Sequence, residues 1–161
     1  MFLSSFDISG YGLSAQRLRA NLISSNIANA NTTRTSEGGP YRRQEAVFKA
    51  FDFNEILNQK LTQNNKVIPY EDPLNEGDDS PLIPITSVVV DKIVRDDNEP
   101  LMKYDPSHPD ANAQGYVAYP NVNAVVEMAD LVEATRAYQA NVAAFQSAKN
   151  MAHNAIGMLQ T

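Results

Sequence analysis

Few residues of this chain suit catalysis, and their spacing does not assemble a reactive site. His108 lies in the turn-like stretch 106–110 and His153 in a helical stretch, and neither has a second histidine or a carboxylate at metal-ligand spacing. Gly10 and Gly12 lack the third glycine and the preceding strand of a dinucleotide fingerprint. Phosphate-binding-loop, zinc-protease and G-x-S-x-G patterns are absent from the sequence. We therefore predict that the chain is not an enzyme and needs no cofactor or metal ion.

Carboxylates crowd most densely into residues 71–79, which hold five of them together with Pro73 and Gly77. When Gly77 is aligned with the glycine of a calcium-binding EF-hand loop, Leu74 and Ile83 stand where oxygen ligands are needed. The stretch therefore fits a solvated acidic loop better than a calcium site. The chain has no cysteine, which excludes disulfides, thiolate metal sites and cysteine nucleophiles.

Net charge and hydropathy limit the partners that the chain can have. With a net charge of −6 and an isoelectric point near 4.8, it lacks the clustered Lys and Arg of a nucleic-acid-binding protein. No run of about eighteen apolar residues is present, so we expect no membrane-spanning helix. The first ten residues lack the positive segment and the unbroken apolar core of a cleaved signal peptide.

Two elements would have to position any functional side chains, because helical periodicity is confined to the two ends of the chain. We predict one helix within residues 1–32 and another within residues 120–161. In the first, a coiled-coil seam with alternating steps of three and four comprises Ile8, Tyr11, Ala15, Leu18, Leu22, Ser25 and Asn29. A second stripe beside it comprises Leu13, Ala20, Ile23, Ile27 and Ala30. The seam of the second helix comprises Ala124, Met128, Leu131, Thr135, Tyr138, Val142, Phe145, Lys149, Ala152, Ile156 and Leu159.

Residues 33–119 form a central segment of different character. All nine prolines lie between Pro40 and Pro120, and the stretch after Pro120 offers Asn121 or Asn123 as the N-cap of the last helix. Residues 88–94 are rich in β-branched side chains and predict a strand, whereas residues 44–53 fit either a strand or a short helix. The predicted fold is mainly α: long N- and C-terminal helices form a coiled-coil domain, and the Pro-rich central segment contains some β-structure.

The two predicted helices differ in length. At about 1.5 Å per residue, the first spans roughly 39 Å and the second roughly 55 Å. Paired antiparallel, they leave about a third of the second helix without a partner. Its apolar side chains are worth about 1.5–3 kcal/mol each if buried. Either other copies or relatives of the protein cover this stripe, or the central segment folds back over it.

Four motifs resemble those of the bacterial flagellar basal-body rod and hook proteins. Near the N-terminus these are S25-N-I-A-N-A-N-T32 and G39-P-Y-R-R-Q-E-A-V-F48. The stretch before the last helix, Y104-D-P-S-H-P-D-A-N-A-Q-G-Y-V-A-Y-P-N-V-N123, is similar more narrowly to the proximal-rod members of the family. So is its continuation, E127-M-A-D-L-V-E-A-T-R-A-Y-Q-A-N-V142. The resemblance covers both ends of the chain and leaves out residues 51–95.

The resemblance implies a structural subunit of the bacterial flagellar basal body, which polymerises through its terminal helices into the proximal rod and transmits torque along this drive shaft. Members of this family pass through the flagellar type III export apparatus without a cleaved signal and assemble in the periplasm. The implied partners are copies of the chain, other rod proteins, the rod-base junction protein and the export apparatus. The competing hypothesis is a soluble helical-hairpin binding module, such as a flagellar or type III secretion chaperone or adaptor.

In such an assembly, polar residues at helix-packing positions can select partners. Asparagine is a poor residue for a helix interior, yet Asn26 and Asn29 stand near the end of the first helix. A polar seam residue lowers stability but penalises wrong registers and wrong partners; a merely polar helix end is the alternative. The expected helix-packing and assembly surface comprises Ile8, Tyr11, Leu18, Leu22, Asn26, Ile27, Asn29, Met128, Leu131, Tyr138, Gln139, Asn141, Val142, Phe145, Ile156 and Leu159.

Overall fold

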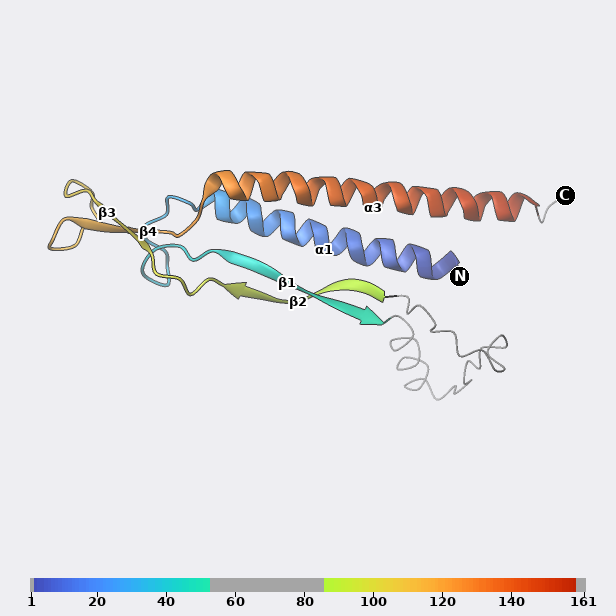
Figure 1. Ribbon diagram of the computed structural model, residues 1–161, viewed down its shortest axis with the longest axis horizontal. Coiled ribbons are helices and arrows are strands. Elements are labelled where there is room, and N and C mark those ends of the chain that lie inside the picture. The colour runs from blue at the N-terminus through green and yellow to red at the C-terminus, as the bar shows by residue number, and fades with distance from the viewer. Residues whose placement is uncertain (1, 53–85, 159–161) are drawn as a thin grey trace.

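The computed structural model describes residues 2–52 and 86–158. Two long helices, α1 (Phe2–Ala28) and α3 (Ala124–Met158), lie side by side along the long axis of the molecule (Figure 1). Between them in sequence are β1 (Gln44–Asp52), β2 (Thr86–Arg95), β3 (Leu101–Tyr104) and β4 (Tyr116–Tyr119). The predicted combination of long terminal helices with a central segment containing strands is confirmed. The acidic stretch 71–79 and Leu159 lie outside the described residues.

The two helices run antiparallel, and a few contacts show how they are aligned. Phe6 packs edge-on against Phe145 with ring centroids 5.0 Å apart, and Arg19 lies 3.6 Å from a carboxylate oxygen of Glu133. Between these contacts the helices approach closely, because an added Cβ at Gly12 would lie 2.9 Å from Oδ1 of Asn141. With residue 6 opposite residue 145, the last two turns of α3 extend past the start of α1 (Figure 1). This overhang is shorter than the expected third of the helix.

The buried positions of α3 differ from the predicted seam by one residue. They are Glu127, Ala134 and Ala148, each directly before a seam position at 128, 135 or 149. The seam was assigned to the larger apolar side chains, such as Met128. Closely approaching helices accommodate small side chains between them, however, so the larger ones lie at the margin or on the outer face.

Strands β1 and β2 form an antiparallel ribbon that packs against α1. Their register runs from Gln44 opposite Arg95 to Asp52 opposite Thr86, with a bulge after Val47. The stretch that fitted either a strand or a helix is therefore a strand, and the strand predicted within residues 88–94 is confirmed. Figure 1 shows α1 between α3 and this ribbon, which explains the wide apolar face of α1. The ribbon covers α1 rather than the stripe of α3.

Strands β3 and β4 form a second antiparallel pair at the end of the molecule opposite the C-terminus of α3 (Figure 1). Gly115 precedes β4 with φ of +81°, a conformation that favours glycine. Val117 of β4 is fully buried, whereas every residue of β3 is exposed. The chain then returns through Pro120 to Asn123. The Oδ1 atom of Asn123 accepts the backbone N–H of Val125 at 3.0 Å, which confirms Asn123 as the N-cap of α3.

Candidate functional site

The most heavily bonded side chain of the described residues is Asn26, in the last turn of α1. It is 0% exposed, and both ends of its amide are fully hydrogen-bonded. Its Nδ2 donates to the carbonyl of Gln44 at 2.9 Å and to Oε2 of Glu127 at 3.0 Å. Its Oδ1 accepts the hydroxyl of Tyr41 at 2.9 Å and the backbone N–H of Gln44 at 3.0 Å. One side chain therefore ties together the end of α1, the start of β1 and the first turn of α3.

Glu127 carries the buried charge of this cluster. It is 1% exposed, and its second carboxylate oxygen accepts Nε of Arg43 at 2.6 Å. Arg43 also donates to Glu45 at 3.0 Å. Burial alone would lower the pKa of Arg43, but its hydrogen bonds and its attraction to Glu127 and Glu45 raise that pKa above its ordinary value. We call Asn26, Tyr41, Arg43, Gln44 and Glu127 together the polar junction.

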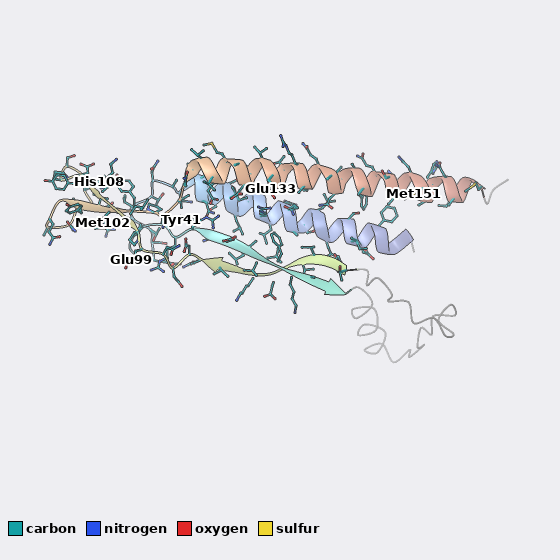
Figure 2. All side chains as sticks on the ribbon, in the orientation of Figure 1. Tyr41, Glu99, Met102, His108, Glu133 and Met151 are labelled. Atoms are coloured by element: carbon teal, nitrogen blue, oxygen red, sulfur yellow. The ribbon has the colours of Figure 1, made fainter. Side chains whose placement is uncertain are left out.

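The turn after α1 brings the side chains of the polar junction together. The chain leaves α1 through a turn in which Nδ2 of Asn29 donates to the carbonyl of Ser25 at 2.9 Å. The backbone N–H of Tyr41 then donates to the carbonyl of Thr32 at 3.0 Å, which returns the chain alongside the helix end. Figure 2 shows Tyr41 at this point, where the helix ends and the β1–β2 ribbon meet. The junction thus follows from the two N-terminal motifs and the start of α3.

The polar junction has the chemistry of a structural cluster. Buried polar groups stabilise a fold when each has a partner, and the amide of Asn26 and both carboxylate oxygens of Glu127 are bonded within the chain. Among the described residues, no group of three or more His, Asp or Glu side chains is arranged to hold a metal ion. A hollow of about 430 Å³ beside the 35–42 loop contains Glu37 and Arg95, which are exposed and bonded to each other.

The second feature of functional interest is the outer face of α3, by which we mean the exposed apolar residues of that helix. Met128 is 54% exposed and Val132 is 52% exposed, although both lie on a well-formed helix. Val125 and Val126 lie beside them near the start of α3, and Met151 and Ile156 are exposed near its C-terminal end. Figure 2 shows Met151 near the overhanging end of α3. Clusters of exposed apolar side chains, such as the one near the start of α3, mark surfaces that bind another protein.

The predicted packing residues range from buried to exposed in the structure. Leu22 and Asn26 are buried, and the half-buried members are Ile8, Leu18, Ile27, Asn29, Leu131, Asn141 and Val142. The exposed members are Tyr11, Met128, Tyr138, Gln139, Phe145 and Ile156. Asn26 was expected to act between subunits, but its bonds lie within the chain. Asn29 bonds within its own turn.

Sequence reasoning missed Tyr41, Arg43, Gln44 and Glu127 of the polar junction. One signal was available in the sequence. Every seventh residue of the last helix, counted from position 127, is small or polar, and one of these residues is an acid: they are Glu127, Ala134, Asn141 and Ala148. An acid at such a position requires a buried partner. Nothing in the spacing of the sequence identifies Arg43 as that partner.

Within the described residues, neither helix combines the length and the apolar character needed to cross a membrane. The architecture is that of an elongated two-helix structural subunit, tied at one end by a buried polar cluster and open along one helix face. Residues 6–34 match the family model for flagella basal body rod proteins, and residues 113–158 match the model for the C-terminal region of the flagellar basal body rod FlgEFG proteins.

Curated relatives match almost the whole chain. The flagellar basal-body rod protein FlgC of Borreliella burgdorferi is 41% identical over 98% of this chain and 97% of its own length. FlgC of Bacillus subtilis is 39% identical over 94% of both chains, and FlgC of Salmonella typhimurium is 34% identical over 92% and 91%. The chain belongs to the flagellar basal-body rod protein FlgC family. These similarities favour a structural rod component over the helical-hairpin chaperone.

Proposed function

We propose that this chain is a structural subunit of the proximal rod of the bacterial flagellum, which polymerises through α1 and α3 and transmits torque along the axis. The outer face of α3 carries the proposal. Burying side chains such as Met128 and Val132 is worth about 1.5–3 kcal/mol each, and the β1–β2 ribbon packs against α1 instead. A neighbouring subunit is the simplest cover for this face.

The predicted packing residues divide naturally between two tasks in this proposal. Leu22, Leu131 and Asn141 pack α1 against α3 inside each subunit. Met128 and Ile156, together with the previously unpredicted Val132, contact neighbours. Residues 1–32 and 120–161 then act as the assembly unit, with residues 33–119 as the part that distinguishes this subunit from others.

The family resemblance extends this proposal to partners and location. Neighbours would be copies of the chain, other rod proteins and the rod-base junction protein, with delivery to the periplasm through the flagellar type III export apparatus and no cleaved signal. The chain would perform no catalysis and would require no cofactor, because torque passes through many distributed contacts.

Complementation of a deletion strain tests the assembly surface. In the bacterium that encodes this chain, M128D and V132D should abolish swimming in soft agar and remove the chain from isolated basal bodies, because a carboxylate would be buried without a partner. The control is I93D on β2, at a position that is 48% exposed and also apolar, which should retain motility. Normal motility of the α3 variants would contradict the proposed surface.

A further inference from the structure

Small side chains make up part of the contact between α1 and α3. On α3 its buried members after Glu127 are Ala134 and Ala148, and on α1 Gly12 faces Asn141. A shift of one heptad, about 10 Å along the axis, would set Gly12 opposite one of these alanines instead of Asn141. Because this exchange buries no charge, packing at Gly12 opposes the shift only weakly.

The polar junction does not share this tolerance. Asn26 is opposite Glu127 in the structure. A one-heptad shift in one direction sets Asn26 against Ala134 and carries Glu127 past the end of α1. A shift in the other direction brings Glu127 to the level of Arg19 and sets Asn26 opposite residue 120, before the start of α3. In both cases the buried bond between Asn26 and Glu127 is broken and Glu127 is separated from Arg43, whereas the bonds of Asn26 to Gln44 do not depend on the position of α3.

We propose that Asn26 and Glu127 are the specificity-determining residues for helix pairing: through Arg43 and the start of β1, they select one alignment of α1 with α3 of the same chain. In a rod, where many such helices lie close together, this selection decides which face of α3 remains open for neighbours. The inference concerns pairing within the chain, so it stands or falls separately from the proposed rod assembly.

A register function and a purely stabilising function predict different behaviour for one double variant. Replacing a buried polar cluster by apolar residues of similar size is often neutral or stabilising, whereas its alignment specificity is lost. The variant N26L/E127L should therefore stay folded and helical, and Arg43 can turn to Glu45 and solvent. If the junction merely stabilises the fold, this variant will keep a single alignment.

Cysteine cross-linking in the full-length chain measures the alignment, and the natural absence of cysteine makes each introduced pair unambiguous. The pair R19C/E133C reports the native alignment, because these residues form an ion pair in the structure. The pairs R19C/V126C and R19C/A140C report shifts of one heptad in either direction. A short bismaleimide reagent, with monomeric products separated from dimeric ones on a gel, gives the yield of each alignment.

With the junction intact, the native pair should yield at least about tenfold more monomeric product than either shifted pair. In N26L/E127L the shifted products should rise to within about threefold of the native product, with helix content unchanged by circular dichroism. The control N29L, which removes an asparagine bonded only within its own turn, should keep the native pattern. E127Q preserves side-chain volume and should give an intermediate pattern if the double variant fails to fold.

Equal yields of the three pairs in the chain with an intact junction would overturn the proposal. So would a native pattern in a folded N26L/E127L chain, or, where that variant does not fold, in E127Q. Loss of motility in the α3 surface variants is independent of these outcomes, so failure of the alignment proposal is distinguishable from failure of the rod proposal.

Discussion

The substitution N26A tests the energetic importance of the polar junction most sharply. It deletes two donated and two accepted hydrogen bonds of 2.9–3.0 Å from a side chain with no exposed surface. The carboxylate oxygen of Glu127 that accepts from Asn26 is buried, so leaving it without a donor costs its full desolvation penalty of about 1–3 kcal/mol. The freed groups of Tyr41 and Gln44 are only part-buried and can bind water, which limits their cost.

Adding about 1 kcal/mol for those groups and subtracting about 0.6 kcal/mol for the better helix propensity of alanine gives a loss of about 1.4–3.4 kcal/mol. At this chain length the loss corresponds to a fall in Tm of roughly 3–14 °C. Urea unfolding followed by circular dichroism at the helix band, together with a thermal scan, measures both quantities.

The neighbouring asparagine supplies a matched control. N29A removes one bond to the carbonyl of Ser25 and one from Thr32, both within the turn that ends α1 and only part-buried. It should cost less than about 1 kcal/mol. If N26A cost no more than N29A, the reasoning that gives the buried hydrogen bonds of the polar junction a large share in stability would be refuted.

Three further predictions concern other parts of the chain. R43A leaves the carboxylate of a buried glutamate without its cation and should lower the free energy of unfolding by about 3–5 kcal/mol, measured by urea unfolding. G10A should stabilise α1 by up to about 1 kcal/mol, because the added Cβ meets nothing within 4 Å. G12A should give no such gain, because its Cβ meets the side chain of Asn141 on the facing helix at 2.9 Å. Equal Tm values of the two variants would contradict this contrast. The pKa of the Glu37 carboxyl should lie below its ordinary value in an NMR pH series, because Arg95 donates hydrogen bonds to it at 2.6 and 3.2 Å and attracts its charge. The contribution of this pair to stability is complete above the ordinary pKa and is lost as pH falls through the lowered pKa. The variant R95Q should restore the ordinary pKa.

Helix periodicity predicted the two long helices because each has many turns and no internal proline. The N-cap of α3 was narrowed to Asn121 or Asn123 by the residues after Pro120, and the structure identifies Asn123. The alignment of the seam was not predicted, because periodicity identifies an apolar face but not the distance of approach. At Gly12 that distance is small enough for the side chain of Asn141 to fill the space of a Cβ.

The polar junction illustrates the other limit of sequence reasoning. Asn26 stood out as an unsuitable residue for a helix interior, so its importance was visible in the sequence. Its partners were not, since Glu127 is 101 positions away and Arg43 lies in the connection just before β1. Side-chain pairs so distant in sequence become predictable only once the chain path is known. The sequence predicted an unpaired apolar stripe where the longer helix outruns the shorter one, and Ile156 is exposed there. The exposed cluster near the start of α3 was not predicted, and Val132 lies off the alternation of threes and fours.

Photo-cross-linking from the outer face of α3 in assembled basal bodies tests the central claim most directly. The chain carries no cysteine, so the V132C variant has a single thiol that a thiol-reactive photo-cross-linker can label. Basal bodies are isolated from the complemented deletion strain, and the cross-linked products are mapped by mass spectrometry. The account predicts cross-links from position 132 to a helix of a neighbouring rod subunit. Cross-links confined to the same chain, with a label that stays open to solvent in the intact basal body, would contradict it.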